Sequence, residues 1–365
     1  MAFFSRINIE SYRGIENLKI EKLKRINLIV GDNNCGKTSV LEAIELFRSS
    51  GNMANVYKVA RQRESITFMN SNSYFDSFIC MFPKTKDNHL SLSVSGVLNR
   101  KKIEFSIDGV KDRILLDAKD QNIRRNLMAH AAEGEVEADA FHGSLFWGDG
   151  VDFNRTRLDI NQYSPVTGTT VSSRDKVSIV YVSPFEHLRG NVISGIVRNE
   201  AYKEICIKAL QLFDPDIEDM LIFRSDTGNR PVEYLRHKKT GDMPISNYGD
   251  GIKKVLALSN AIAQAADGIL LIDEIETAIH KKYYDDIFGF IVKACNAFNV
   301  QAFVTTHSIE AIDGLLATQK YEKNTKKDDI CVCTIKRTEK GSFSRILTGR
   351  EVHENREAFG FEVRL

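Results

Sequence analysis

The feature that most constrains this chain is the stretch from Gly31 to Thr38, which reads Gly-Asp-Asn-Asn-Cys-Gly-Lys-Thr. It fits the phosphate-loop pattern G-x-x-x-x-G-K-[ST]. The apolar run 26–30 directly before it predicts a short buried strand. The segment after it predicts a helix with one buried face, because apolar residues recur there at helical spacing: Val40, Leu41, Ile44 and Phe47. The alternative is a chance glycine turn with a surface lysine. Such a turn needs neither a strand before it nor a helix after it, so the predicted strand and helix favour the phosphate loop.

A loop of this kind binds the phosphate chain of a nucleotide. Its glycines let backbone N–H groups turn inward, and the helix N-terminus adds a partial positive charge. Lys37 is expected to reach the β- and γ-phosphates, and the Thr38 hydroxyl to bind Mg²⁺. The residues predicted to contact the nucleotide here are Gly31, Asn33, Asn34, Cys35, Gly36, Lys37, Thr38 and Ser39.

A second motif supplies carboxylates at the end of an apolar strand. Residues 269–272 are continuously apolar, and Asp273 and Glu274 follow them directly. Ligands of open α/β sheets bind at the carboxyl ends of the strands. Asp273 is therefore predicted to hold Mg²⁺, and Glu274 to act as the general base for an attacking water.

A third strand ends at His307, in the stretch Val-Thr-Thr-His-Ser that closes at Ser308. A histidine at this position can donate to the γ-phosphate or orient the water. The alternative is a helix start, since Ser308 is a good N-cap. The order of the three strand ends along the chain favours a catalytic role for His307.

Composition limits the class of protein. Lys and Arg number 50 and Asp and Glu 49, so net charge argues neither for nor against nucleic acid. No apolar run approaches a membrane span, and the first residues lack the cleavage site of a secretory signal. Cys331 and Cys333 are expected to be buried reduced thiols rather than metal ligands. We expect a cytoplasmic protein.

Apolar strands alternate with helical stripes after residue 178, which predicts an α/β fold with a parallel sheet covered on both faces. We expect three parts. Residues 1–111 form the first part of the head, with an antiparallel β subdomain that includes a strand at 78–82. Residues 112–177 form a polar insertion or lid, helical near 122–140 and loop-like over 143–174. Residues 178–365 form the second part of the head.

These motifs together resemble the ABC-type ATPase heads of SMC, RecF and OLD-like proteins, a group of P-loop NTPases. The opening stretch 9–14 resembles the first strand and turn of that group, which makes Arg13 a candidate for contacting the nucleotide. The family's signature loop is matched in position by four residues at a helix start: Tyr248, Gly249, Asp250 and Gly251. This Gly-Asp-Gly form is similar to OLD-like and AAA/ABC phage-defence ATPases, including PARIS-type ATPase subunits, rather than to transporters.

The resemblance implies a chemistry and a set of partners. Two heads would dimerise around ATP and Mg²⁺, with each nucleotide held between the phosphate loop of one head and the Gly249 loop of the other. SMC-type coiled-coil arms are absent from the sequence, and no D-x-D cluster of a TOPRIM nuclease follows His307. The resemblance therefore implies an ATP-hydrolysing switch in bacterial anti-phage defence that controls a separate effector chain, such as a TOPRIM-like nuclease.

Two other functions stay open. A RecF-like DNA-binding ATPase for repair is allowed by the basic stretches 100–102 and 236–239, although exposed turn lysines explain these as easily and are the favoured explanation. ATP-dependent, salt-sensitive affinity for DNA would identify it. A scaffold that does not hydrolyse ATP is disfavoured by the presence of Lys37, Asp273 and Glu274.

Overall fold

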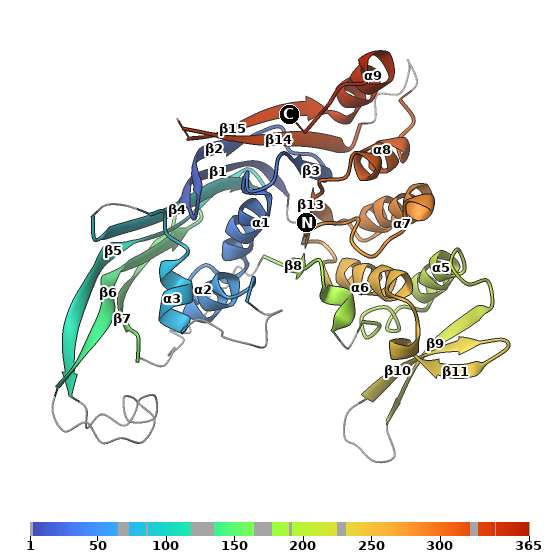
Figure 1. Ribbon diagram of the computed structural model, residues 1–365, viewed down its shortest axis with the longest axis horizontal. Coiled ribbons are helices and arrows are strands. Elements are labelled where there is room, and N and C mark those ends of the chain that lie inside the picture. The colour runs from blue at the N-terminus through green and yellow to red at the C-terminus, as the bar shows by residue number, and fades with distance from the viewer. Residues whose placement is uncertain are drawn as a thin grey trace.

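The computed structural model describes residues 3–64, 73–84, 87–117, 135–163, 177–189, 192–224, 231–321, 328–339 and 341–364. Three sheets organise them (Figure 1). The central sheet has the strand order β15-β14-β3-β13-β12-β8. Its strands are β3 (Ile26–Val30), β8 (Ile179–Val182), β12 (Ile269–Ile272), β13 (Gln301–Thr305), β14 (Ile330–Thr338) and β15 (Gly341–Thr348). All neighbours in it are parallel except β14 and β15.

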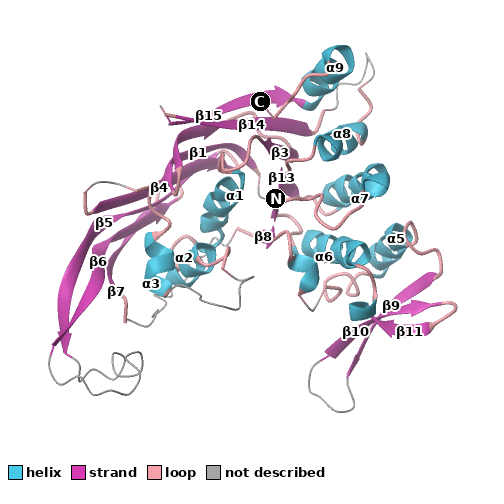
Figure 2. Ribbon diagram, viewed as in Figure 1, coloured by secondary structure: helices cyan, strands magenta, loops and turns pink. Residues whose placement is uncertain are grey.

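Helices cover both faces of this sheet, as the alternation of apolar strands and helical stripes predicts. Four helices, α6 to α9, lie in a row on one side (Figure 2), and α5 packs outside α6 and α7. These are α5 (Glu200–Leu210), α6 (Asp250–Gln264), α7 (Tyr284–Ala297), α8 (Ile309–Ala317) and α9 (Gly349–Phe359). On the other side lie α1 (Lys37–Glu45), α2 (Met53–Ala60) and α3 (Tyr74–Ile79). Short 3₁₀ turns occur at Leu46–Ser49, Glu186–Leu188, Ile245–Asn247 and Lys281–Tyr283.

The core is divided by the central sheet into two clusters, because successive strand residues point to opposite faces. In β3, Leu28 and Val30 pack with α6 to α8, whereas Ile29 packs with α1 and the second sheet. In β12, Leu270 and Leu271 divide in the same way. A strand buried on both faces is continuously apolar, which is the pattern that the sequence shows.

The second sheet is antiparallel and has the order β2-β1-β4-β5-β6-β7. It curves around α1, α2 and α3 (Figure 1). Its strands are β1 (Phe4–Tyr12), β2 (Ile15–Ile20), β4 (His89–Leu98), β5 (Lys101–Asp117), β6 (Glu135–Gly148) and β7 (Phe153–Asn161). A third, small sheet of order β11-β10-β9 lies beside α5 and α6 and is formed by β9 (Ile217–Arg224), β10 (Pro231–His237) and β11 (Gly241–Pro244).

The structure differs from the prediction in the first half of the chain. Most of the described residues in 112–177, where a helix and a loop were expected, are strand: the end of β5, β6 and β7. The helix expected at 122–140 falls on the undescribed residues 118–134 and on the start of β6. The end of β5 has no buried residue, so it lacks the apolar alternation that marks a strand. The strand expected at 78–82 was wrong, because 74–79 form α3.

The longest helix of the described residues, α6, has 15 residues, so no coiled-coil arm is found among them. None of these helices has an apolar stretch long enough to cross a membrane.

Candidate nucleotide site

The phosphate loop joins β3 to α1 and has the backbone conformation that its glycines allow. Gly31 has φ 144° and Gly36 has φ 106°, both in the region that favours glycine, and Asn34 has φ 62°. A Cβ atom on Gly31 would lie 2.3 Å from the Ile335 carbonyl oxygen of β14. Gly31 is therefore required both by its conformation and by the close approach of the neighbouring strand.

Lys37, the first residue of α1, folds back over this loop. Its Nζ donates to the carbonyl oxygens of Gly31 and Asp32, each at 2.9 Å. Asn33 and Asn34 are exposed, and Cys35 is buried below them. An ammonium beside a phosphate loop is the group that contacts the β- and γ-phosphates in nucleotide sites of this kind.

Asp273 joins the second motif to the first. Its carboxylate lies at the end of β12, only 5% exposed, and accepts hydrogen bonds from three hydroxyls. Thr38 Oγ1 is 3.0 Å from Oδ2, Thr305 Oγ1 is 2.6 Å from Oδ1, and Tyr181 OH is 3.1 Å from Oδ2. Strands β3, β13, β12 and β8 are successive neighbours, so their carboxyl ends bring these groups together.

The oxygen atoms at and beside Asp273 are suitable ligands for a magnesium ion. Mg²⁺ takes oxygen ligands, and the Thr38 hydroxyl and the Asp273 carboxylate are adjacent oxygen donors. Burial, followed by the charge of Asp273, raises the pKa of Tyr181 well above its usual range. Tyr181 therefore stays protonated and acts as a donor to this carboxylate.

Glu274 follows Asp273 in a left-handed backbone conformation, with φ 49°. Its amide donates to Thr305 Oγ1 at 2.9 Å, and its Oε2 accepts from Thr277 at 3.3 Å. Such a conformation is uncommon for a residue with a side chain and is often found at functional sites. The Glu274 side chain is 41% exposed, so its carboxylate is accessible to water.

His307 lies beside this carboxylate. Its Nδ1 is 3.8 Å from Glu274 Oε1 and 3.5 Å from Glu276 Oε1. The Glu276 carboxylate also accepts the backbone amides of His307 at 3.0 Å and Ser308 at 3.3 Å. Ser308 caps α8 through a 3.1 Å hydrogen bond from the Ala311 amide, so the stretch both starts a helix and presents the histidine.

The signature-like residues lie at the start of α6. Gly249 is the N-cap, with φ −66°, and Asp250 is the first helical residue and largely exposed. Tyr248 is partly buried, and Gly251 packs against Phe213. In the described part of the chain no hydrogen bond or ion pair joins these four residues to the phosphate loop.

Arg13 is held at the back of α1 and not at the loop. Its Nε is 2.9 Å from Oε2 of the fully buried Glu42, and its Nη2 donates to the Ala60 carbonyl at 3.2 Å. Arg63 binds the other oxygen of Glu42 at 2.7 Å and also donates to Ser39 Oγ at 2.8 Å. Arg13 and the Ser39 hydroxyl thus brace the helix that follows the loop.

Three residues of this site were not predicted from the sequence: Tyr181, Thr305 and Glu276. Thr305 and Glu276 each lie two residues from a predicted site residue, so a search of every polar side chain near a strand end would have found them. Tyr181 lies within β8, where an aromatic residue is ordinary, and only the strand order brings it to Asp273.

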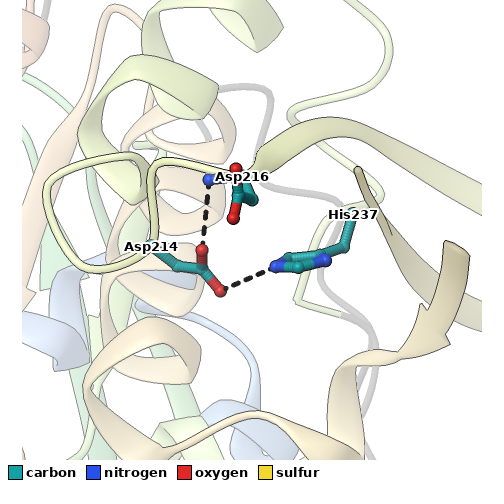
Figure 3. A group of neighbouring side chains, drawn as sticks. All are labelled: Asp214, Asp216 and His237. Atoms are coloured by element: carbon teal, nitrogen blue, oxygen red, sulfur yellow. Dashed lines mark hydrogen bonds and ion pairs between the residues drawn. The ribbon is translucent and has the colours of Figure 1, made fainter. Parts of the chain in front are cut away.

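A second polar cluster lies between α5 and the small sheet. Figure 3 shows Asp214, Asp216 and His237 grouped with ligand atoms close enough for one metal ion. The His237 Nδ1 accepts the backbone amides of Lys239 at 3.2 Å and Thr240 at 3.1 Å. Its Nε2 therefore carries the proton and faces Asp214 Oδ2 at 3.3 Å, and Lys239 Nζ already binds Asp216. These contacts favour a charge network over a metal site.

Comparison with known protein families gives one match. Residues 26–313 fit the family described as "AAA domain, putative AbiEii toxin, Type IV TA system". This range includes the phosphate loop, the Asp273 strand and His307.

Several curated proteins are similar over most of the chain. The "ATP/GTP phosphatase" of Helicobacter pylori is 23% identical over 350 residues, which cover 88% of this chain and 90% of that protein. The "DNA replication and repair protein RecF" of Rickettsia conorii is 20% identical over 349 residues, which cover 85% of this chain and 96% of that protein. Among solved structures, an Smc head domain of Pyrococcus furiosus with an extended coiled coil, bound to the C-terminal domain of ScpA, has a TM-score of 0.49 and 12% identity, covering 99% of this chain and 100% of that chain.

Proposed function

We propose that this chain is an ATP-driven switch, on the premise that it belongs to the family of AAA domains described as "putative AbiEii toxin, Type IV TA system". It is an ATPase of the AAA/RecF/SMC type. In this proposal, two heads bind each other through ATP and release each other on hydrolysis. The change between these states controls a separate effector protein, a nuclease, in a bacterial anti-phage defence system.

The observation that carries the proposal is the pairing of Thr38 with Asp273 at 3.0 Å. These residues are 235 positions apart in the chain, and they come together because β3 and β12 flank β13. Glu274 and His307 lie at the same edge, 3.8 Å apart. The phosphate loop, the residues that we assign to the cation and the residue that we assign as general base are therefore neighbours at one edge of the sheet, which supports the proposal.

Each residue has a role in hydrolysis that its position supports. Lys37 neutralises the charge of the β- and γ-phosphates. Thr38 and Asp273 would hold Mg²⁺, which neutralises phosphate charge when bound. The Glu274 carboxylate takes the proton of the attacking water as the bond from the water oxygen to the γ-phosphorus forms and the bond to ADP breaks. His307 donates to the γ-phosphate, held in place by Glu276 through its backbone amide.

The partner and the defence role rest on two supports. The family description names a toxin system, which is consistent with control of a toxic effector. The Gly249 loop begins α6 with an open N-terminus, without a side-chain cap, and helix N-termini with free N–H groups bind phosphate. Since this loop does not contact the phosphate loop of its own chain within the described residues, we propose that it contacts the nucleotide of a second head.

The test is ATP turnover by the purified chain over a range of protein concentrations, with wild type beside Glu274→Gln. We expect turnover per molecule to rise with concentration, because the site is completed by a second head, and to fall at least a hundredfold in Glu274→Gln. Lys37→Ala serves as a control that loses ATP binding. Turnover that is independent of concentration would contradict the dimer, and an active Glu274→Gln would contradict the assigned base.

A second function is favoured by the similarity to RecF of Rickettsia conorii, which covers 96% of that protein. In this alternative the ATP-bound dimer holds DNA. Its test is binding of double-stranded DNA with and without ATP at several salt concentrations. Affinity that requires ATP and falls steeply with salt would support this alternative over the effector switch.

A further inference from the structure

The segment that follows α9 returns to the carboxyl end of the central sheet. Gly360, with φ 62°, ends α9 in a left-handed conformation. Three residues later, Val363 is fully buried, and its carbonyl accepts from Thr334 Oγ1 at 2.6 Å and from Arg345 Nη2 at 3.2 Å. This segment is therefore anchored on β14 and β15 by Val363, without any contribution from the side chain of the next residue.

That next residue, Arg364, points toward the nucleotide site. Its Nη1 donates to the His307 carbonyl at 2.8 Å. Its Nε and Nη2 each lie 2.7 Å from a different oxygen of Glu362, which holds the guanidinium plane in a fixed orientation. The Arg364 side chain remains 34% exposed, so a ligand can reach it.

A cavity of about 350 Å³ lies between this arginine and the phosphate loop. It is lined by Gly31, Asp32, Asn33, His307, Glu362 and Arg364. Lys37 Nζ binds the carbonyls of Gly31 and Asp32 at 2.9 Å, so the cavity adjoins the position of the ammonium that reaches the β- and γ-phosphates. The cavity therefore corresponds to the terminal-phosphate end of the nucleotide site.

We propose that Arg364 contacts the terminal phosphate of ATP bound to its own chain and, through the His307 carbonyl, keeps the histidine beside that phosphate. This inference rests on the proposed function, since it requires nucleotide at the phosphate loop. A guanidinium presents several N–H donors in one plane, which suits phosphate oxygens. Glu362 orients the side chain before nucleotide binds, and its own negative charge opposes the phosphate.

The two members of this pair therefore have opposite effects on nucleotide binding. Removing Arg364 deletes an attractive charge from the terminal-phosphate end, whereas removing the charge of Glu362 deletes a repulsive one. A purely structural pair would behave differently, because loss of either partner would loosen the same segment. The change in affinity caused by each substitution should also depend on the γ-phosphate, so the binding of ATP analogues should change more than the binding of ADP.

The experiment measures the dissociation constants of the ATP analogue AMP-PNP and of ADP, with Mg²⁺, for the full chain at concentrations that keep it monomeric. We expect Arg364→Ala to weaken AMP-PNP binding about tenfold or more, as for a lost charge-assisted hydrogen bond, and ADP binding less than twofold. Arg364→Lys should be intermediate, and Glu362→Gln should bind AMP-PNP more tightly than wild type.

Arg356→Ala is the matched control. Arg356 holds the same segment through the Phe361 carbonyl at 2.8 Å and through Asp313, but it does not line the cavity. If Arg364→Ala and Glu362→Gln both weaken the binding of AMP-PNP and of ADP to the extent that Arg356→Ala does, the pair is structural and the inference is overturned. Unchanged AMP-PNP affinity in Arg364→Ala, with normal wild-type binding, would overturn the inference alone. A wild type that binds neither nucleotide would overturn the proposed function together with it.

Discussion

At the scale of single residues, Lys254 in α6 has an unfavourable environment for a charge. It is fully buried, and its Nζ donates to the Pro184 carbonyl at 3.3 Å. Burial lowers its pKa to about 8, although the carboxylates of Glu276, Asp273 and Glu274 oppose this change. Oε2 of Glu276 is buried and has no hydrogen-bond partner among the described residues. A buried ammonium that forms no ion pair with these carboxylates among the described residues reduces the stability of the fold.

Replacing this lysine tests that conclusion through pH. An unfolded lysine has a pKa of about 10.4. Between that pH and the folded-state pKa of about 8, the unfolded chain binds more protons, so the free energy of unfolding rises with pH. Lys254→Met lacks this rise. We expect it to be more stable than wild type at pH 7, by up to about 3 kcal/mol, and the difference to shrink between pH 8 and pH 10 in urea denaturation.

Lys253→Met is the control for this measurement, because Lys253 is on the same helix and pairs with the exposed Asp250 at 3.4 Å. It should differ from wild type by less than about 0.5 kcal/mol at every pH. A Lys254→Met variant whose stability runs parallel to wild type from pH 7 to pH 10 would show that the buried lysine does not titrate in this range.

At the scale of elements, two facing glycines shape the long strands β5 and β6. Gly109 and Gly143 are paired across the strands. A Cβ atom on Gly109 would lie 2.4 Å from the His142 carbonyl oxygen and 2.6 Å from Cζ of Phe141. The Phe141 ring, fully buried, also lies within van der Waals contact of Phe78 and Phe82. The glycine pair therefore makes space for the aromatic cluster that joins the sheet to α3.

Gly109→Ala should loosen this junction. We expect a loss of about 1–3 kcal/mol in the free energy of unfolding, since an added methyl must displace a ring or a backbone oxygen in a packed core. Urea denaturation would measure it, with Ser106→Ala on the same strand as a control that changes stability by less than about 0.5 kcal/mol. Equal stability of Gly109→Ala and wild type would mean that Phe141 moves aside without cost.

The same region shows where sequence patterns fail to predict elements. The strands that carry the site were predictable because they are short, continuously apolar and followed by polar motifs, as at β12. The far end of β5 has no buried residue, so its sequence resembles that of a loop. In α3 the buried residues Phe75 and Phe78 are three positions apart, as on one face of a helix, and Ser73 caps the helix by accepting from the Asp76 amide. Six residues are nevertheless too few to show a helical repeat of apolar residues in the sequence.

At the scale of the whole molecule, the motifs indicate which residues act but not how they are joined. Asp273 was predictable from its strand end, whereas its contacts with Tyr181 and Thr305 depend on the order of β8, β12 and β13. Arg364 lies 57 residues beyond His307 and in no motif, and the contacts of Val363 with distant segments and of Phe361 with Arg356 bring it there. Contacts between distant segments of this kind arise from topology, which a local pattern does not contain.

The dimer is the largest structure that the proposal requires, and Gly249 offers a selective test of it. An added Cβ on Gly249 would meet no atom within 4 Å, and its φ of −66° is ordinary for alanine. The single chain should therefore accept Gly249→Ala with a change of at most about 1 kcal/mol, the difference expected at an N-cap. A nucleotide and a second head approaching this loop would meet the methyl group directly.

We expect Gly249→Ala, in a Glu274→Gln background that retains ATP, to bind ATP as a monomer but to lose the ATP-dependent dimer in sedimentation. Gly289→Ala is the matched control, because a Cβ there also meets no atom within 4 Å but Gly289 lies inside α7 rather than at the start of α6. It should dimerise like its parent. If Gly249→Ala dimerises equally well, the loop does not contact the second head, and the switch would have to use another surface. A selective loss would place the Gly249 loop at the interface, because the fold of the single chain leaves room for the methyl group.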